Sequence, residues 1–303
     1  METTRPKVPA EAIELYNSFI HGGMSRRSFM NRLNRMAVGG VAAAAMVDAL
    51  MPNYAAAQQV SKTDDRIKTS YETVPSPSGN GTIKGYLVRP VSADTREAKS
   101  VKLPGIIVVH ENRGLNPHIE DIARRLALAN FMAFAPDGLN SVGGFPGDDY
   151  NGGLLFNKVD KPKMMADFQA SAEWLKARPD CTGKIGITGF CYGGGVSNNM
   201  AARMGDGLAA AVPYYGAVPP AAEIPKIKAA VLVHHGELDK NTAASWPAYN
   251  TALTAAGVPH EGHIWPNCVH GFNCDATPER YNKEASDQAW ALTIGWFNKY
   301  VRG

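Results

Sequence analysis

The chain has 303 residues, four cysteines and a formal net charge of +3. Residues 1–57 hold six basic and four acidic side chains, so the other 246 residues carry a charge close to +1. That balance gives no reason to expect nucleic acid or an anionic membrane surface as a partner. The cysteines form no Cys-x-x-Cys pair or other zinc-type spacing, so we expect no metal and no cofactor.

The N-terminal segment carries an export-type pattern. Residues 25–30 read Ser-Arg-Arg-Ser-Phe-Met, the form of a twin-arginine motif, and a small apolar run follows from Met36 to Ala49. Three alanines before Gln58 resemble a signal-peptidase site. We therefore predict that residues 1–57 are a signal region read by the twin-arginine export machinery.

Export would place the protein in the periplasm or outside the cell, and an unused signal would leave it in the cytoplasm. The alternative structural interpretation of this region is an amphipathic helix packed on the body. The apolar run is too short for a comfortable membrane span, so we expect no stable span.

Residues 58–80 are predicted to be a linker and residues 81–303 a single globular domain. Strands and helices alternate along that domain. Strand patterns fall at 83–88, 103–109, 131–135, 185–188, 209–215, within 230–239 and at 260–266, and helical patterns at 119–129, 163–177, 194–203, 243–256 and 283–301. Such alternation requires crossover connections, so we predict an α/β fold with a mainly parallel open sheet and helices on both faces.

A Gly-rich segment at 138–162, with aromatic and acidic insertions, interrupts this alternation and is predicted to be a long loop. We expect it to cover the site and to shape an acyl pocket. Tyr150 in the loop would bind substrate there, together with Tyr192, Tyr214 and Trp246.

The most informative motif is Gly-Phe-Cys-Tyr-Gly-Gly at 189–194, directly after a short apolar strand. A strand that turns sharply into a helix raises one side chain above the sheet, and the flanking glycines leave room for the turn. The raised residue is Cys191, which indicates nucleophilic acyl chemistry at sulfur. The alternative is a buried cysteine in a phosphate-type turn, but neither a Lys-Ser/Thr ending nor the dinucleotide glycine spacing is present.

Two further residues complete a nucleophile–acid–histidine order. Asp239 follows a buried strand and a glycine turn, and His270 follows the strand pattern at 260–266. His270 would take the proton of Cys191, and Asp239 would fix the imidazole tautomer. Asp239 alone could equally be a turn former, but the order of the three residues favours the catalytic role.

These motifs, with His-Glu-Asn-Arg-Gly at 110–114, resemble the dienelactone hydrolase family of α/β-hydrolases over about Thr82 to Tyr300. The resemblance implies the α/β-hydrolase fold and a carboxylic ester or lactone hydrolase acting on a small molecule through a thioester. It also implies roles for individual residues: Cys191 as nucleophile, Asp239 and His270 as its partners, Glu111 as a carboxylate near the thiol, and the backbone N–H groups of Tyr192 and Asn112 as oxyanion hole.

One position departs from the family. Members that hydrolyse the anionic dienelactone hold its carboxylate with arginines, one of them four residues after the catalytic histidine, where this chain has Cys274. We therefore expect a substrate other than the anionic dienelactone, although Arg113 could bind substrate from another direction. Cys268 and Cys274 flank His270, and their spacing leaves open whether they form a disulfide.

Two other classes of protein remain as alternatives. A reactive Cys191 could serve a thiol redox or sensor protein, although the elbow has no resolving cysteine. A non-catalytic binding module could keep the same fold, although nucleophile, acid and base are all present.

Overall fold

The computed structural model describes residues 8–20, 23–36, 43–91 and 101–303. The predicted apolar run from Met36 to Ala49 and the signal region 1–57 lie partly outside these residues.

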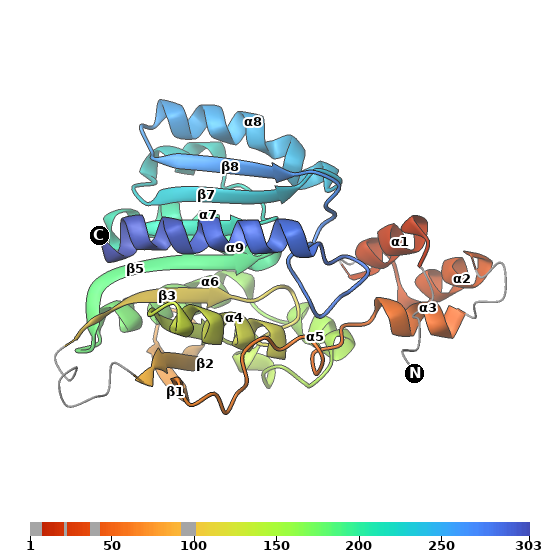
Figure 1. The fold of residues 1–303 in the computed structure, drawn as a ribbon, viewed down its shortest axis with the longest axis horizontal. Coiled ribbons are helices and arrows are strands. Elements are labelled where there is room, and N and C mark those ends of the chain that lie inside the picture. Colours follow the sequence, from red (N-terminus) through yellow and green to blue (C-terminus); the bar gives the residue numbers. More distant parts are fainter. Residues whose placement is uncertain (1–7, 21–22, 37–42, 92–100) are drawn as a thin grey trace.

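One eight-stranded sheet forms the centre of the molecule (Figure 1), in the order β1-β2-β4-β3-β5-β6-β7-β8. The strands are β1 (Ile67–Ser76), β2 (Gly81–Pro90), β3 (Leu103–Val109), β4 (Met132–Pro136), β5 (Cys181–Phe190), β6 (Ala210–Tyr214), β7 (Ala230–Gly236) and β8 (His260–Trp265). β2 pairs antiparallel with both β1 and β4, and every other neighbouring pair is parallel. The predicted mainly parallel open sheet is confirmed.

The expected linker at 58–80 is wrong in part, because Ile67–Ser76 form the strand β1. Its ten residues pair in continuous register with β2, from Ile67 opposite Pro90 to Ser76 opposite Gly81. The burial of β1 alternates only weakly, so its sequence lacks the clear period of a half-buried strand. Pairing with a neighbour, which a local pattern does not report, makes it a strand.

Helices cover both faces of the sheet. They are α4 (Pro117–Leu128), α6 (Lys161–Ala177), α7 (Tyr192–Met204), α8 (Lys240–Ala255) and α9 (Lys283–Phe297), the last continuing into a π-helical turn at Asn298–Arg302. α4 and α9 lie in front of the sheet in Figure 1, and α6, α7 and α8 pack on the other face.

The central strand β3 shows why both faces are apolar. Ile106 and Val108 pack into the core under α4 and α9, whereas Ile107 and Val109 pack into the core under α6 and α7, and all four are fully buried. Successive side chains of a strand point to opposite faces, so a parallel strand covered on both sides needs a continuous apolar run.

The segment predicted as a long loop at 138–162 contains a short 3-10 turn and the helix α5 (Asp149–Phe156). Asp148 begins α5 by accepting a hydrogen bond from the backbone N–H of Asn151, at 2.9 Å. Asp160 caps α6 in the same way. These local caps satisfy helix-terminal N–H groups, which allows a Gly-rich segment to be helical.

Three N-terminal helices, α1 (Ala10–Ile20), α2 (Arg26–Met36) and α3 (Ala43–Leu50), lie beside the carboxyl ends of the strands (Figure 1). They have an apolar cluster of their own, in which the rings of Phe19 and Phe29 stack with centroids 4.7 Å apart. No helix within the described ranges is long and apolar enough to cross a bilayer. The region is a helical unit that contacts the body, an arrangement that does not decide between a signal and a permanent part of the fold.

The turn from β5 into α7 is tightly constrained. Cys191 adopts φ 54° and ψ −111°, a conformation that residues with side chains rarely adopt. A Cβ on Gly189 would lie 2.2 Å from the carbonyl oxygen of Gly193, and one on Gly193 would lie 2.3 Å from that of Val109. The two glycines therefore let three backbone segments meet below Cys191.

We predict that Gly193→Ala lowers the free energy of unfolding by about 2 kcal/mol or more, because the added methyl group overlaps backbone atoms that cannot move aside. Gly195→Ala, two residues along the same helix, is the matched control. A Cβ there has no neighbour closer than 3.6 Å, and alanine favours a helix over glycine by up to about 1 kcal/mol. Urea unfolding of both variants tests this, and equal stability of the two would contradict it.

Candidate functional site

Cys191 opens into a small chamber at the carboxyl ends of the strands. His270, Glu111 and Arg280 line the same chamber, whose volume is about 10 Å³. Its remaining walls come from the loop after β3, from α5 and from α1. They are Asn112, Arg113, Asp149, Tyr16 and Ile20.

His270 is held between an acid and the thiol. Its Nδ1 lies 2.5 Å from Oδ2 of Asp239, which also accepts a 2.6 Å hydrogen bond from the hydroxyl of Thr242. Burial alone would lower the pKa of His270, but Cys191 and the hydrogen bond to Asp239 outweigh it and raise that pKa to about 10. The structure therefore brings Cys191, His270 and Asp239 together in the expected order.

The pKa of Asp239 responds to the same contacts. Burial acts to raise it, but the hydrogen bonds from His270 and Thr242 have the larger combined effect, so the pKa is lowered. The carboxylate is therefore kept ionised beside the imidazole. At His235, near the end of β7, the effect of burial exceeds that of the nearby Asp239 and lowers the pKa to about 4.

The loop after β3 carries Glu111, Asn112 and Arg113 into the chamber. His110 anchors the start of this loop, since its Nδ1 lies 2.5 Å from the carbonyl oxygen of Glu111 and its Nε2 accepts a 2.8 Å hydrogen bond from the N–H of Gly138. Both of these histidine contacts are buried or nearly so, which fixes the loop against the sheet.

Tyr192, the other expected oxyanion residue, is the first residue of α7. An N–H group in the first turn of a helix has no partner within that helix and points away from it, so that of Tyr192 is available beside Cys191. The side chain of Tyr192 turns aside and packs against Phe156, with ring centroids 4.8 Å apart.

Two expected substrate-binding residues lie elsewhere. Tyr214 is fully buried in β6, where its hydroxyl lies 2.7 Å from that of Thr293 on α9. Trp246 lies on α8, and its indole ring packs closely on Gly262 of β8. A Cβ on that glycine would lie only 2.1 Å from the ring. Neither lines the chamber. Each of these two aromatic residues packs a helix against the sheet. The sequence around an aromatic residue does not distinguish this role from substrate binding.

Arg280 is a chamber residue that the sequence did not indicate. It lies in an irregular loop ten residues after His270, outside any motif, and it is 7 % exposed. Burial acts to lower the pKa of Arg280, but Tyr16 and then Glu111, with smaller contributions from other neighbours, outweigh it and raise that pKa. Its guanidinium approaches Gly271, next to His270.

Arg280 changes the expectation about substrate charge. Cys274 stands where the family has an arginine, yet Arg280 and Arg113 both line the chamber, so the argument against an anionic substrate loses its basis.

Cys268 and Cys274 are buried and form no disulfide. In the part of the chain that the structure describes, no three His, Cys, Asp or Glu side chains are arranged to hold a metal ion.

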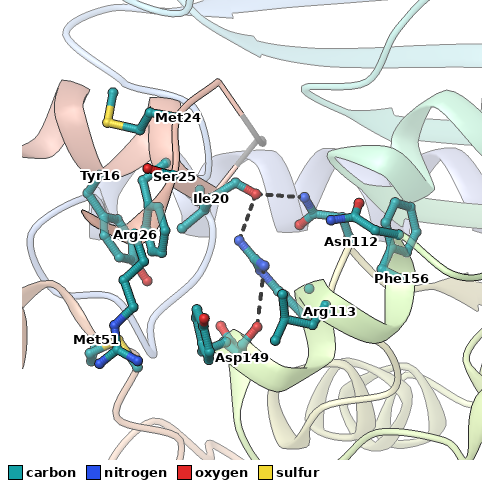
Figure 2. Close-up of a pocket in the computed structure, with 15 residues that line it drawn as sticks. Tyr16, Ile20, Met24, Ser25, Arg26, Met51, Asn112, Arg113, Asp149 and Phe156 are labelled. Carbon is teal, nitrogen blue, oxygen red and sulfur yellow. Dashed lines mark hydrogen bonds between the residues drawn. The ribbon is translucent and has the colours of Figure 1, made fainter. Parts of the chain in front are cut away.

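A larger cavity of about 390 Å³ lies next to the chamber, between the N-terminal helices and α5 (Figure 2). Tyr150 lies on its α5 side, with Arg26 of α2 4.8 Å above its ring. Most other lining side chains are apolar or aromatic, among them Phe19, Met24 and Phe156. Arg113 and Asn112 line both spaces.

Comparison with known proteins matches residues 83–301 to the family described as "Dienelactone hydrolase family". A "Putative carboxymethylenebutenolidase" of Escherichia coli O157:H7 is 31% identical over 256 residues, which is 80% of this chain and 90% of that protein. The "Putative hydrolase fragment YghX" of Escherichia coli strain K12 is 54% identical over 118 residues, 39% of this chain and 96% of the fragment. The crystal structure of a "Putative Dienelactone Hydrolase" from Klebsiella pneumoniae is similar with a TM-score of 0.65 and 28% identity, over 77% of this chain and 99% of that one.

The pKa of His235 should lie below the ordinary histidine pKa and that of His270 above it. We predict that NMR titration finds His235 near pH 4 and His270 near pH 10. Cys191→Ala should lower the pKa of His270, because it removes the group that contributes most to raising it. Titration of both rings near pH 6.5, in wild type and variant alike, would contradict this account.

Proposed function

Because the chain belongs to the dienelactone hydrolase family, has the α/β-hydrolase fold and is a carboxylic ester hydrolase, we propose that Cys191, His270 and Asp239 form its catalytic triad. The proposed substrate is a small carboxylic ester or lactone. The observation that carries the proposal is His270, which contacts Asp239 through Nδ1 and interacts with Cys191 in a chamber that both side chains line.

In the proposed reaction, His270, whose raised pKa favours the imidazolium, holds the proton of Cys191, and the thiolate Sγ attacks the substrate carbonyl carbon. The tetrahedral oxyanion collapses, the C–O bond to the alcohol breaks, and His270 returns the proton to the leaving oxygen. A thioester on Cys191 remains. Water then attacks that thioester while His270 accepts its proton, and the proton goes back to sulfur as the acid product leaves.

The backbone N–H groups of Tyr192 and Asn112 are proposed to bind the oxyanion. Deleting a single such donor in other enzymes costs about 3 kcal/mol of transition-state stabilisation. Glu111 is proposed to assist in removing the thiol proton. Its carboxylate lies in the same chamber as Arg280, whose positive charge offsets the cost of burying a negative one.

Arg280 and Arg113 are proposed to orient the polar part of the substrate. Two guanidinium groups in a largely buried site favour a group that carries negative charge or develops it. Tyr150, on the wall of the larger cavity, is proposed to contact the apolar part.

We predict that Cys191→Ala lowers kcat/KM for p-nitrophenyl acetate by roughly 10⁶-fold, as for nucleophile loss in other triads. Cys191→Ser should leave weak activity and His270→Ala should block turnover. The control is Cys181→Ala, because Cys181 is buried at the opposite end of β5 and should leave kcat/KM nearly unchanged. Full activity in Cys191→Ala would end the proposal.

We also propose that residues 25–30 direct twin-arginine export, to the periplasm or out of the cell. The pattern in the sequence supports this, and so does the exposure of Arg26 and Arg27 in the first turn of α2, where a receptor could bind them.

Replacing both Arg26 and Arg27 with lysine should retain the protein inside the cell, because a paired guanidinium fork is lost while the charge is kept. Arg32→Lys with Arg35→Lys on the same helix is the matched control and should leave export intact. Cell fractionation and immunoblotting measure the outcome. Equal export of both double variants would refute the signal.

A further inference from the structure

The N-terminal helices narrow the chamber that contains Cys191, whose side chain stays partly exposed. Tyr16 and Ile20 of α1 line it together with Glu111 and His270. The chamber volume of about 10 Å³ is close to the minimum that holds one water molecule. The carbonyl group of an ester, with its two substituents, needs more space than that.

The contact uses polar groups of the site itself. The carbonyl oxygen of Ile20 accepts hydrogen bonds from Asn112 Nδ2 at 2.9 Å and from a terminal nitrogen of Arg113 at 2.7 Å (Figure 2). The guanidinium of Arg280 lies 5.6 Å from the ring centroid of Tyr16. The Ile20 carbonyl therefore accepts hydrogen bonds from donors that could otherwise bind a substrate carbonyl or carboxylate.

A second set of hydrogen bonds fastens the segment after α3. The hydroxyl of Tyr54 donates to Asp149 at 2.7 Å and accepts from Asn116 Nδ2 at 2.9 Å. The N–H of Asn53 donates to the carbonyl oxygen of Ala276 at 2.6 Å. Asp149 and Ala276 belong to α5 and to the loop between His270 and Arg280, so both sides of the chamber are fastened to one segment.

The packing between these helices and the body is incomplete. Apolar side chains of α1, α2 and α3 pack mainly on one another in a cluster separate from both cores of the body. The cavity of about 390 Å³ remains between these helices and α5. A permanent interface would fill such a space, because close packing supplies much of its stability.

We infer that α1–α3 are an internal plug, which docks on the catalytic face through the Ile20 carbonyl and restricts access to the partly exposed Cys191 until the plug is released. The inference rests on the proposed role of Cys191, but its consequence is access to a thiol and can be measured without turnover. The chain has low reactivity while the plug is docked and gains reactivity when the segment before Gln58 moves or is removed.

The test uses the full chain with a protease recognition sequence inserted at Ala55–Ala56, which are exposed in a turn. Alkylation of Cys191 by iodoacetamide is followed by peptide mass mapping, before cleavage and after the cut segment has been removed by gel filtration. We expect the rate to rise at least about tenfold, because the docked plug limits how often the reagent reaches the sulfur. Adding the segment back should slow alkylation again, and circular dichroism checks that the body stays folded.

Two full-length variants provide a control without cleavage. Tyr16→Ala removes a wall of the chamber and should speed alkylation, whereas Glu14→Ala on the exposed side of α1 should not. Equal alkylation rates before and after release would overturn the plug.

Ester turnover, measured in parallel, separates the two proposals. Faster alkylation on release without any ester cleavage would refute the proposed function and leave the plug standing. Cys191-dependent cleavage of p-nitrophenyl acetate at the same rate with and without the segment would refute the plug and leave the proposed function.

Discussion

The strained turn between β5 and α7 is the constraint on which the rest of the site depends. Cys191 adopts a positive φ because the chain must reverse from strand to helix within one residue, and Gly189 and Gly193 let the backbone of β3 and α7 approach beneath it. The turn sends the sulfur away from the sheet and places the first N–H groups of α7 beside it. A single local distortion thus fixes both the proposed nucleophile and a proposed oxyanion donor.

Charge arranged around that turn determines what the sulfur can do. Asp239 contacts His270, and Glu111 and Arg280 line the same chamber as Cys191. Since the side chains of His270 and Asp239 are mostly buried, their charges interact through a low effective dielectric constant. The N-terminal helices cover more of the site, so the same contacts that strengthen the electrostatics also restrict access. Release of the plug would let substrate enter and would also expose the site to more water.

The features that the sequence predicted are those set by local constraints. The glycine spacing around Cys191 and the strand ends before Asp239 and His270 depend on a few neighbouring residues, so pattern and structure agree there. Arg280 was missed because it enters the chamber through an irregular loop whose course depends on tertiary packing. Tyr214 and Trp246 were misplaced because a buried aromatic residue of the core and one of a pocket have the same local pattern.

The N-terminal region shows the same limit. A twin-arginine pattern indicates what a receptor would read, but it contains no information on where the helices dock. Docking depends on the Ile20 carbonyl and on Tyr54 meeting partners about 90 and 60 or more residues away in the sequence, and no local periodicity reports such contacts.

The most direct test of the account is to identify the covalent intermediate. After rapid acid quenching of the enzyme mixed with an ester, mass mapping of the digest should place the acyl group on the peptide that contains Cys191. Acyl label on another residue, or rapid turnover with no acylated peptide, would contradict nucleophilic attack by this sulfur.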